Sequence, residues 1–340
     1  MKEPVKNIDF DQRIFAASKT AFEPLAIDLF FYQYENNAIY RKYCDLIKVN
    51  ADLIDSIEQI PFLPISFFKT HDVKTGDFAQ EMIFESSGTT GDTTSRHLIK
   101  DLELYKESFS RGFQKFYGNV EEKCILGLLP SYLERNNSSL VYMVDELIKR
   151  SMNSLSGFYL DDLEKLHRMI MHNEILKIPT ILIGVTFALL DFAEKFPMKL
   201  RHTVVMETGG MKGRREEMTR QEVHSFLKSQ LGVQLVHSEY GMTELMSQAY
   251  SKGDGIFHCP NWMRILLRDE DDPLTVLGEP PQDGDSPHQT GVINVIDLAN
   301  IHSCAFIATD DAGKLYENGS FEVIGRVDNS DIRGCSLMVV

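Results

Sequence analysis

Hydrophobic positions in the first sixty residues recur at the spacing of an α-helix. Apolar and aromatic side chains stand three or four positions apart at Phe22, Leu25, Leu29, Phe30 and Tyr34. This spacing predicts amphipathic helices. Pro61 and Pro64 follow, and proline at such a place favours the end of a helical region.

Between residues 100 and 240, short apolar runs alternate with amphipathic segments. The predicted strands are Cys124–Leu129, Thr180–Gly184, His202–Met206 and Val233–His237. The predicted helices are Asp101–Tyr117, Ser139–Lys149, Leu163–Ile170, a segment running from the second strand through Phe196, and a segment near Arg214–Gln230. Strands and helices that alternate in this way indicate βαβ units and a mostly parallel sheet.

From about Ile256 onward the pattern changes to short apolar runs among frequent Pro, Gly and Asp. The runs are Ile265–Leu267, Gly291–Ile296 and Ser303–Ala308, and they predict a β-rich subdomain with tight turns. The acidic stretch Glu270–Pro287 is predicted to be a surface loop. We therefore expect one domain over 1–340, with a helical region at 1–60, an α/β core at 61–255 and a β-rich subdomain at 256–340.

Composition narrows the class of protein. Hydrophobic residues make up 43% and charged residues 25% of the 340 positions, as in ordinary globular proteins. The net charge of -15 argues against nucleic-acid binding, which needs clustered Lys and Arg. No run approaches the ~20 apolar residues of a membrane span, and the N-terminus lacks the apolar core of a signal peptide. These features predict a cytoplasmic location.

Cysteine spacing gives no metal or disulfide signature. The five cysteines are far apart and form no CxxC pair, so neither a zinc ribbon nor a disulfide framework is expected. His258 and Cys259 could bind a metal together with His237 or Cys304. Their spacing fits no zinc pattern, however, so structural roles are favoured.

The segment Glu85–Gly91 has the composition of a phosphate-binding loop. It holds Gly88 and Gly91 together with four hydroxyl side chains, Ser86, Ser87, Thr89 and Thr90. Glycines let the backbone approach a phosphate, and successive N–H groups can form an anion-binding nest. The loop lacks the GK[ST] ending of a Walker A motif and the GxGxxG spacing of a dinucleotide fold. An ordinary surface turn is the alternative.

Four later segments resemble, in order, motifs of the adenylate-forming superfamily of acyl-CoA and aryl-CoA ligases. They are Thr208-Gly209-Gly210, Ser238-Glu239-Tyr240-Gly241-Met242-Thr243-Glu244, Thr309-Asp310-Asp311 and Gly325-Arg326-Val327-Asp328. The resemblance covers nearly the whole chain from Pro61 onward. It implies the α/β N-terminal large domain of that superfamily, with mixed, mostly parallel sheets, flanking helices and a small β-rich subdomain.

The resemblance also implies a nucleotide site for ATP and Mg²⁺, in which a carboxylic acid becomes an acyl-adenylate. Tyr240 can stack on adenine, and Glu244 supplies a hard oxygen ligand for Mg²⁺. Asp311, or its neighbour Asp310, can accept hydrogen bonds from the ribose hydroxyls, and Arg326 can reach the ribose or the phosphates. The predicted nucleotide-binding residues are Ser86, Ser87, Gly88, Thr89, Thr90, Gly91, Thr208, Gly209, Gly210, Glu239, Tyr240, Gly241, Met242, Thr243, Asp310, Asp311 and Arg326. Thr243 and Glu244 are the predicted catalytic pair.

Two departures from the superfamily pattern narrow the resemblance. The phosphate loop continues as Asp92-Thr93-Thr94-Ser95-Arg96-His97 instead of Pro-Lys-Gly, so Arg96 either replaces the missing cation or faces solvent. His97 could touch a phosphate or lie on the surface. The chain ends at Val340, so the mobile C-terminal domain and its catalytic lysine are expected to be absent.

With these departures the chain most resembles the LuxE acyl-protein synthetases of bacterial luminescence operons, near the phenylacetate-CoA ligase branch. That resemblance implies that a fatty acyl group moves to an enzyme cysteine near the C-terminus and then to a partner acyl reductase. Cys335 is the cysteine in that position, and Arg333 could lower the pKa of its thiol. The alternative is a buried thiol in an apolar terminal strand.

An acyl pocket is expected where predicted strands end, because ligands of α/β sheets bind outside the carboxyl ends of strands. Pro130-Ser131-Tyr132 and Gly184-Val185-Thr186 follow two such strands, which makes Tyr132, Gly184 and Gly210 candidates.

Two other functions stay open. The protein could transfer the acyl group to coenzyme A or a carrier protein, or it could be a non-catalytic nucleotide-binding subunit of a reductase complex.

Overall fold

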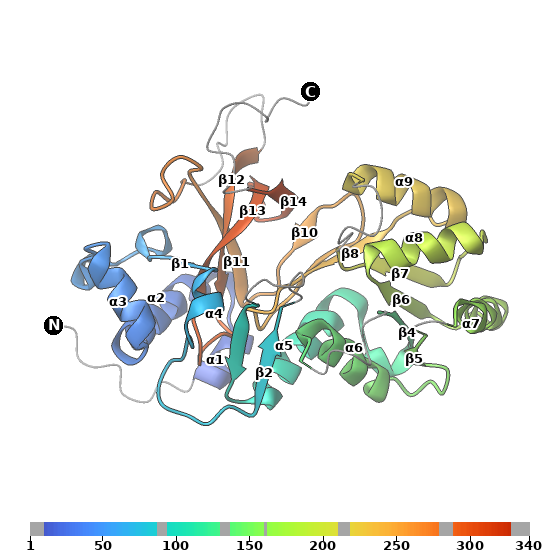
Figure 1. Ribbon diagram of the computed structural model, residues 1–340, viewed down its shortest axis with the longest axis horizontal. Helices are drawn as coiled ribbons and strands as arrows, with labels where there is room; N and C mark the ends of the chain where they lie inside the picture. The colour runs from blue at the N-terminus through green and yellow to red at the C-terminus, as the bar shows by residue number, and fades with distance from the viewer. Residues whose placement is uncertain are drawn as a thin grey trace.

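One long mixed β-sheet runs through the computed structural model, which describes residues 10–86, 94–129, 137–159, 162–209, 218–278 and 288–327. Its strands follow the order β11-β12-β13-β14-β10-β9-β8-β7-β6-β4-β5, with β1 beside β13, and a separate pair joins β2 to β3 (Figure 1). The strands are β1 Leu63–Pro64, β2 Met82–Glu85, β3 Arg96–Ile99, β4 Cys124–Leu128, β5 Gly157–Phe158, β6 Thr180–Gly184, β7 Thr203–Glu207, β8 His237–Tyr240, β9 Ala249–Ser251, β10 Phe257–His258, β11 Met263–Arg268, β12 His288–Asp297, β13 Phe306–Tyr316 and β14 Phe321–Arg326.

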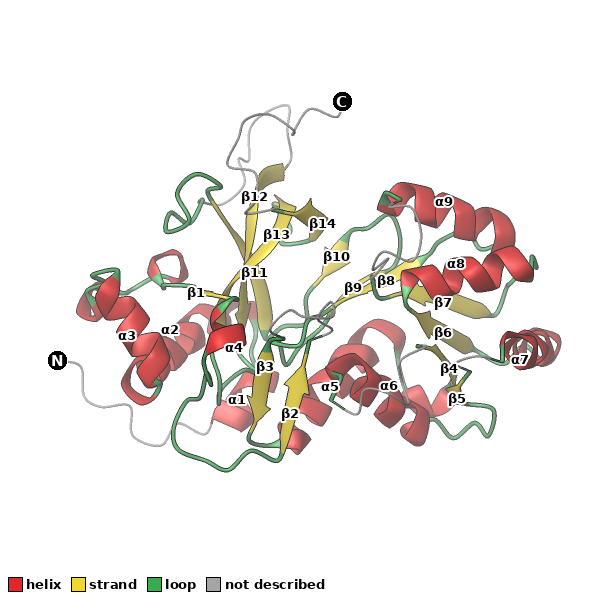
Figure 2. Ribbon diagram, viewed as in Figure 1, coloured by secondary structure: helices red, strands yellow, loops and turns green. Residues whose placement is uncertain are grey.

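The helices form two groups, one beside each half of the sheet (Figure 2). They are α1 Phe10–Phe15, α2 Lys19–Asn36, α3 Ala38–Leu46, α4 Phe67–Thr70, α5 Leu102–Tyr117, α6 Ser139–Arg150, α7 Leu163–Leu176, α8 Thr186–Lys195 and α9 Arg220–Leu231. Polar side chains cap most of them at the N-terminus: Asp101 accepts from two backbone N–H groups of α5, and Thr219 forms a capping box with Glu222 on α9. Such caps satisfy N–H groups that the first helical turn leaves free.

The strands β5, β4, β6, β7 and β8 pair in parallel and are covered on both faces. Along β4, Cys124, Leu126 and Leu128 enter one apolar cluster with residues of α7, α8 and α9, whereas Ile125 enters a second cluster with residues of α5 and α6. In Figure 1, α8 and α9 lie on one side of these strands and α5 and α6 on the other. A parallel strand buried on both faces reads as a continuous apolar run, which is why β4 and β6 were predictable.

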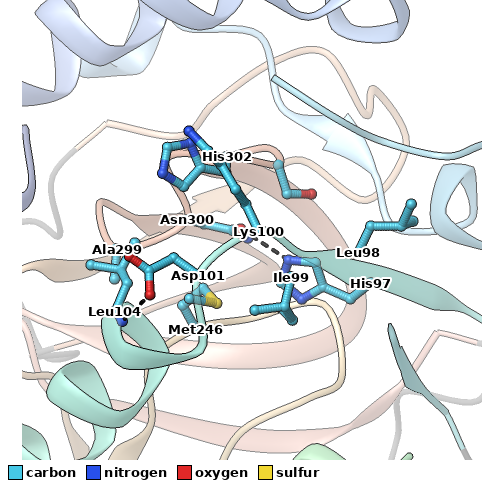
Figure 3. Close-up of a pocket in the computed structure, with 11 residues that line it drawn as sticks. His97, Leu98, Ile99, Lys100, Asp101, Leu104, Met246, Ala299, Asn300 and His302 are labelled. Atoms are coloured by element: carbon cyan, nitrogen blue, oxygen red, sulfur yellow. Dashed lines mark hydrogen bonds between the residues drawn. The ribbon is translucent and has the colours of Figure 1, made fainter. Parts of the chain in front are cut away.

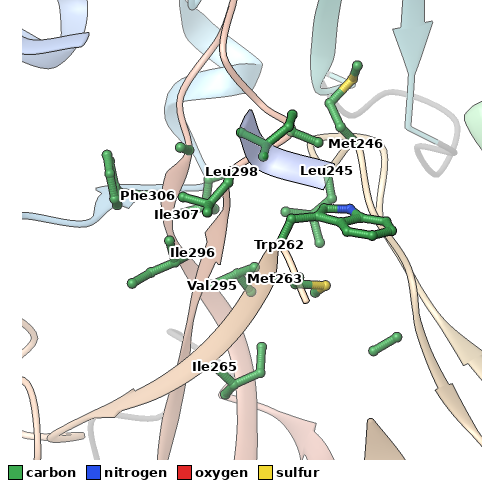
Figure 4. Packing of buried hydrophobic residues seen from close by; sticks show 14 of the residues in the cluster. Leu245, Met246, Trp262, Met263, Ile265, Val295, Ile296, Leu298, Phe306 and Ile307 are labelled. Carbon is green, nitrogen blue, oxygen red and sulfur yellow. The ribbon is translucent and has the colours of Figure 1, made fainter. Parts of the chain in front are cut away.

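The other half of the sheet is antiparallel. β11, β12, β13 and β14 pair in sequence, and β10 and β9 connect β14 to the parallel strands. Trp262 lies at the centre of the apolar side chains that pack here, beside Leu245, Met246 and Met263 (Figure 4). Its indole N–H lies 3.1 Å from Ser108 Oγ and 3.0 Å from Ser247 Oγ, so the polar edge of this buried ring is satisfied.

The N-terminal helices pack against this antiparallel half. Gln33 of α2 donates to the carbonyl oxygens of Asn300 and Ile301, and its own carbonyl accepts from the N–H of Ala305. Asn37, which caps α3, donates to the carbonyl of Ser303 at 2.9 Å. Both side chains are fully buried, so helices from the start of the chain hold the turn before β13.

One strand prediction needs correction. Val233–His237 is not a strand: the strand is β8, His237–Tyr240, which begins where the apolar run ends. Leu235 is exposed, whereas Ser238 and Glu239 are buried in β8, which lies inside the sheet between β7 and β9. The apolar run Ser303–Ala308 leads into β13, which begins at Phe306. No helix in the described ranges is long and apolar enough to cross a membrane.

Candidate functional site

Three motifs that are far apart in the sequence converge beside the end of β8. Tyr240 contacts Asp311, Thr243 contacts His97, and Glu244 contacts Ser95 through side-chain or backbone hydrogen bonds. The β8 turn, the β13–β14 pair and the strand after the glycine loop therefore share one region of the molecule.

The base of the predicted phosphate loop is closed by backbone pairing. Glu85 of β2 lies opposite Arg96 of β3, the N–H of Ser86 donates to the carbonyl of Ser95 at 3.0 Å, and the N–H of Ser95 donates to Ser86 Oγ at 2.9 Å. The loop residues predicted to bind phosphate, Ser87, Gly88, Thr89, Thr90 and Gly91, lie outside the described residues. Ser95 in turn contacts Glu244, so the end of the loop at Ser95 lies next to this carboxyl group.

Glu244 contacts the base of the predicted phosphate loop through a hydrogen bond between its carboxyl group and Ser95. Its side chain is buried, and burial raises the pKa of its carboxyl group, while a hydrogen bond from Ser95 and the charges of Arg326 and Lys69 act in the opposite direction. A carboxylate oxygen is the kind of ligand that Mg²⁺ prefers. No three His, Cys, Asp or Glu side chains form a metal-binding group within the described ranges. A magnesium ion held here would therefore rely on Glu244 together with phosphate oxygens and water, as is usual for this ion.

Tyr240 and Asp311 form a buried pair. The Tyr240 hydroxyl donates to Asp311 Oδ2 at 2.9 Å, and Asp311 Oδ1 lies 3.5 Å from Nε of Arg326. The Tyr240 ring packs against Phe321 at 5.4 Å and Phe257 at 5.9 Å between centroids. Burial raises the pKa of Asp311, whereas Asp310 is exposed. Of the two aspartates proposed for ribose binding, Asp311 is the one held in a fixed geometry.

Thr208 and Gly209 follow β7, and the carboxylate of Glu207 positions them. The N–H of Gly209 donates to Glu207 Oε2 at 2.7 Å, and Thr186 Oγ1 donates to the same oxygen at 3.1 Å. Gly209 has φ of 73°, a conformation that favours glycine. Gly210 lies outside the described residues.

Glu207 is buried yet ionised. Burial alone would raise the pKa of Glu207, but hydrogen bonds from His224 and Ser238, the charge of Arg220 and the N–H of Gly209 outweigh it and lower the pKa to about 2. Sequence analysis did not single out this residue. Its signal was a carboxylate at the end of a buried strand, directly before Thr208-Gly209-Gly210.

Glu239 is also buried, but its pKa is shifted upward, whereas that of Glu207 is shifted downward. Burial, and then the charge of Glu207, raises the pKa of Glu239 to about 8. A Cβ atom added at Gly241 would overlap Oε1 of Glu239, so this glycine leaves room for the carboxyl group. The contact of Glu239 or Gly241 with a nucleotide stays a prediction.

Asp297, at the end of β12, holds the segment that follows Glu244. Its Oδ2 accepts from the N–H groups of Met246 at 2.8 Å and Ser247 at 2.9 Å, and its Oδ1 accepts from the Ser247 hydroxyl at 2.6 Å. Burial raises the pKa of Asp297 to about 6, with these donors acting against the increase. The sequence offered no motif for this residue, because its partners lie about fifty positions away.

Other predicted site residues have structural partners or fall outside the description. Arg96 forms an ion pair with Asp72 at 3.0 Å, with both side chains about half exposed. A side chain at Gly184 would collide with Leu189, so packing alone accounts for glycine there. Tyr132 and Cys335 lie outside the described residues.

His97 is not on the surface, contrary to one of the two hypotheses for it. Only 1% of the residue is exposed, and one ring nitrogen lies 2.8 Å from the carbonyl oxygen of Thr243. The other lies 3.1 Å from Oδ1 of Asn300 (Figure 3). Burial lowers the pKa of His97 to about 4. The side chain thus links the strand after the glycine loop to the backbone of the Tyr240–Glu244 motif.

Comparison with known proteins bears on the family and the fold of the chain. A model of the acyl-protein synthetase family LuxE matches residues 4–340. No curated protein matches the sequence. Among solved structures, the chain is similar to the ATP-bound RpMatB-BxBclM chimera B3, with 17% identity and a TM-score of 0.51 over 74% of this chain and 49% of that one.

It is also similar to ATP-bound MatB from Rhodopseudomonas palustris, with 17% identity and a TM-score of 0.50 over 72% of this chain and 47% of that one. The chain spans about half the length of these two structures. At this level of identity the likeness concerns the fold alone. It confirms the predicted fold class, a mixed α/β fold like that of the N-terminal domain of adenylate-forming ligases.

Proposed function

The chain belongs to the LuxE family of acyl-protein synthetases, and from this premise we propose that it activates a carboxylic acid with ATP and passes the acyl group to a thiol. The observation that carries the proposal is the convergence of Tyr240–Asp311 and Ser95–Glu244 contacts beside the closed base of the glycine loop. These groups have the chemistry needed to hold a ribose, a cation and phosphates in one place.

In the first step, a carboxylate oxygen of the acid attacks the α-phosphorus of ATP. The new bond joins that oxygen to phosphorus, and pyrophosphate leaves with the electron pair of the broken bond. The protein forms no covalent bond in this step, so its contribution is positioning and charge neutralisation. Bound beside Glu244, Mg²⁺ would neutralise charge on the phosphate oxygens.

Different residues of the chain bind the ribose, the base and the phosphates. Asp311, oriented by the Tyr240 hydroxyl, accepts from ribose hydroxyls, and Arg326 at its side adds a fixed positive charge. Gly209, held by Glu207, presents backbone to the base. Thr243 and the hydroxyl side chains of the loop donate to phosphate oxygens, and we assign the loop at 86–91 to that task.

In the second step, a thiolate attacks the acyl carbon, a thioester forms and AMP leaves. Four cysteines lie in the described part of the chain, and burial raises the pKa of each thiol: to about 12 for Cys44 and Cys259, and above the ordinary value for Cys124 and Cys304. A buried thiol with a raised pKa is a poor nucleophile. This supports Cys335 as the acceptor. An acyl reductase is the proposed protein that takes the acyl group onward, as the resemblance to the LuxE family implies.

Covalent labelling tests the acceptor. After incubation with ATP, Mg²⁺ and a radiolabelled fatty acid, the protein should carry label through a bond that neutral hydroxylamine cleaves. Cys335→Ser should abolish the label, whereas the control Cys259→Ser should retain it. If wild-type protein stays unlabelled, or if Cys335→Ser is labelled like wild type, the self-acylation proposal is wrong.

Two other functions predict different results. A ligase that serves coenzyme A or a carrier protein would form a thioester on the added acceptor and leave Cys335 unlabelled. A non-catalytic nucleotide-binding subunit would bind ATP without acid-dependent exchange of pyrophosphate.

A further inference from the structure

Three contacts of the buried side chains His97 and Asn300, of which the two outer ones are hydrogen bonds, connect β3 with the motif at Thr243 and Glu244. His97 Nδ1 lies 2.8 Å from the carbonyl oxygen of Thr243, His97 Nε2 lies 3.1 Å from Oδ1 of Asn300, and Asn300 Nδ2 donates to the carbonyl oxygen of Glu244 at 2.8 Å. His97 and Asn300 are each 1% exposed. Figure 3 shows the two side chains meeting in the pocket that they line.

Both ends of this bridge are carbonyl oxygens, which can only accept hydrogen bonds. The ring proton of His97 therefore belongs on Nδ1, and the amide nitrogen of Asn300 must face Glu244. Burial lowers the pKa of His97 to about 4, so at neutral pH the ring carries this single proton. The middle contact, Nε2 to Oδ1, then has no proton between its two atoms. The two end contacts hold the backbone.

The two carbonyls belong to consecutive residues whose side chains face the nucleotide in the proposed function. A hydrogen bond to a backbone carbonyl oxygen fixes the orientation of the peptide plane, and with it the direction of the adjoining side chain. The bridge starts at His97, two positions after Ser95, whose hydroxyl contacts the Glu244 carboxyl group. The short segment from Ser95, just before β3, to His97 within β3 therefore reaches the motif twice, once from the backbone side and once from the side-chain side.

We propose that His97 and Asn300 are positioning residues for acid activation: they hold the Thr243 and Glu244 peptides so that these side chains meet the phosphates and the cation in a fixed geometry. This inference rests on the proposed function. Neither residue touches substrate. Outer-shell partners of this kind typically change activity or metal affinity about 10- to 100-fold when lost.

Two substitutions at His97 distinguish the contributions of its two ring nitrogens. In His97→Asn the side-chain amide nitrogen can take the place of Nδ1 and keep the bond to Thr243. In His97→Gln the longer side chain reaches the place of Nε2 and loses that bond. Asn300→Asp keeps the shape of the side chain but turns an acceptor toward the Glu244 carbonyl. His302→Asn is the control, since His302 lines the same pocket and its ring meets Phe78 rather than the motif.

The first readout does not depend on activity. In the ligand-free protein, hydrogen exchange over residues 241–248 should be faster in His97→Gln and Asn300→Asp than in wild type, His97→Asn or His302→Asn, while the midpoint of thermal unfolding reports any global change. The second readout is acid-dependent pyrophosphate–ATP exchange. His97→Gln and Asn300→Asp should lower kcat about 10- to 100-fold and require more Mg²⁺, with KM for the acid unchanged.

Unchanged hydrogen exchange in His97→Gln and Asn300→Asp would overturn the inference, and so would a loss of kcat in His97→Asn as large as in His97→Gln. If wild-type protein catalyses no exchange of pyrophosphate, the proposed function fails, but the hydrogen-exchange comparison still decides whether the bridge positions the motif.

Discussion

The hydroxyl of Tyr240 donates a hydrogen bond to Oδ2 of Asp311 at 2.9 Å and joins two motifs separated by 71 positions. Both residues are buried, and Arg326 lies on the other side of the aspartate. The carboxyl group that we assign to the ribose is therefore oriented by the aromatic residue of the β8 motif before any nucleotide arrives.

Tyr240→Phe removes this donor and keeps the ring. A buried acceptor that loses its partner costs about 1–3 kcal/mol, so the variant should unfold more easily by that amount and bind ATP more weakly. Urea denaturation and ATP titration measure the two effects. Tyr117→Phe serves as control, because the Tyr117 hydroxyl contacts His237 instead. Equal ATP affinity in Tyr240→Phe and wild type would contradict the role assigned to the pair.

Glu239 gives a prediction for stability against pH. Its pKa rises from 4.5 in the unfolded chain to about 8 in the folded protein, so the folded state binds the proton more tightly. The stability that this proton provides is complete below about pH 4.5 and is lost as pH rises toward 8, at up to about 1.4 kcal/mol per pH unit.

Glu239→Gln cannot ionise, so its free energy of unfolding should rise relative to wild type between pH 5 and pH 8. Urea denaturation at each pH unit measures the difference. Glu222→Gln is the control, because hydrogen bonds from Thr219 lower the pKa of Glu222 and place its effect below pH 4.5. A difference between Glu239→Gln and wild type that stays constant over this range would show that Glu239 is already ionised.

Gly241 gives a steric prediction. In Gly241→Ala the new Cβ would overlap Oε1 of Glu239, and Cγ of Gln248 lies 3.2 Å from the same position. Overpacking of this kind costs about 1–3 kcal/mol. The double variant with Glu239→Ala should recover part of that loss, which a double-mutant cycle measures. Gly325→Ala, where a Cβ meets nothing within 4 Å, should be tolerated. Strict additivity of the two substitutions would mean that another contact limits Gly241.

Local hydrophobic patterns in the sequence predicted the elements whose buried residues form a continuous or periodic apolar run. β6, Thr180–Gly184, was predicted with its observed bounds because every one of its side chains is buried in a continuous apolar run. β8 was misplaced because its residues are polar. Ser238 finds His224 on one face, and Glu239 lies opposite Tyr250 in the ladder with β9. Such partners come from elsewhere in the chain and leave no periodic signal.

The same limit applies to the site. Ordered motifs identified Tyr240, Glu244 and Asp311, which carry recognisable chemistry. They did not identify Glu207, Asp297 or Asn300, whose role in the structure is to bind backbone groups. The contacts of His97 cross 146 and 203 positions, and only the folded chain brings these residues together.

Acid-dependent exchange of labelled pyrophosphate into ATP tests the central claim most directly. With wild-type protein, Mg²⁺ and a panel of carboxylic acids, we predict exchange that needs an acid and that is strongest for fatty acids, and we predict that Glu244→Gln abolishes it. The same protein binding ATP tightly while no acid in the panel supports exchange would contradict the assignment of acid activation.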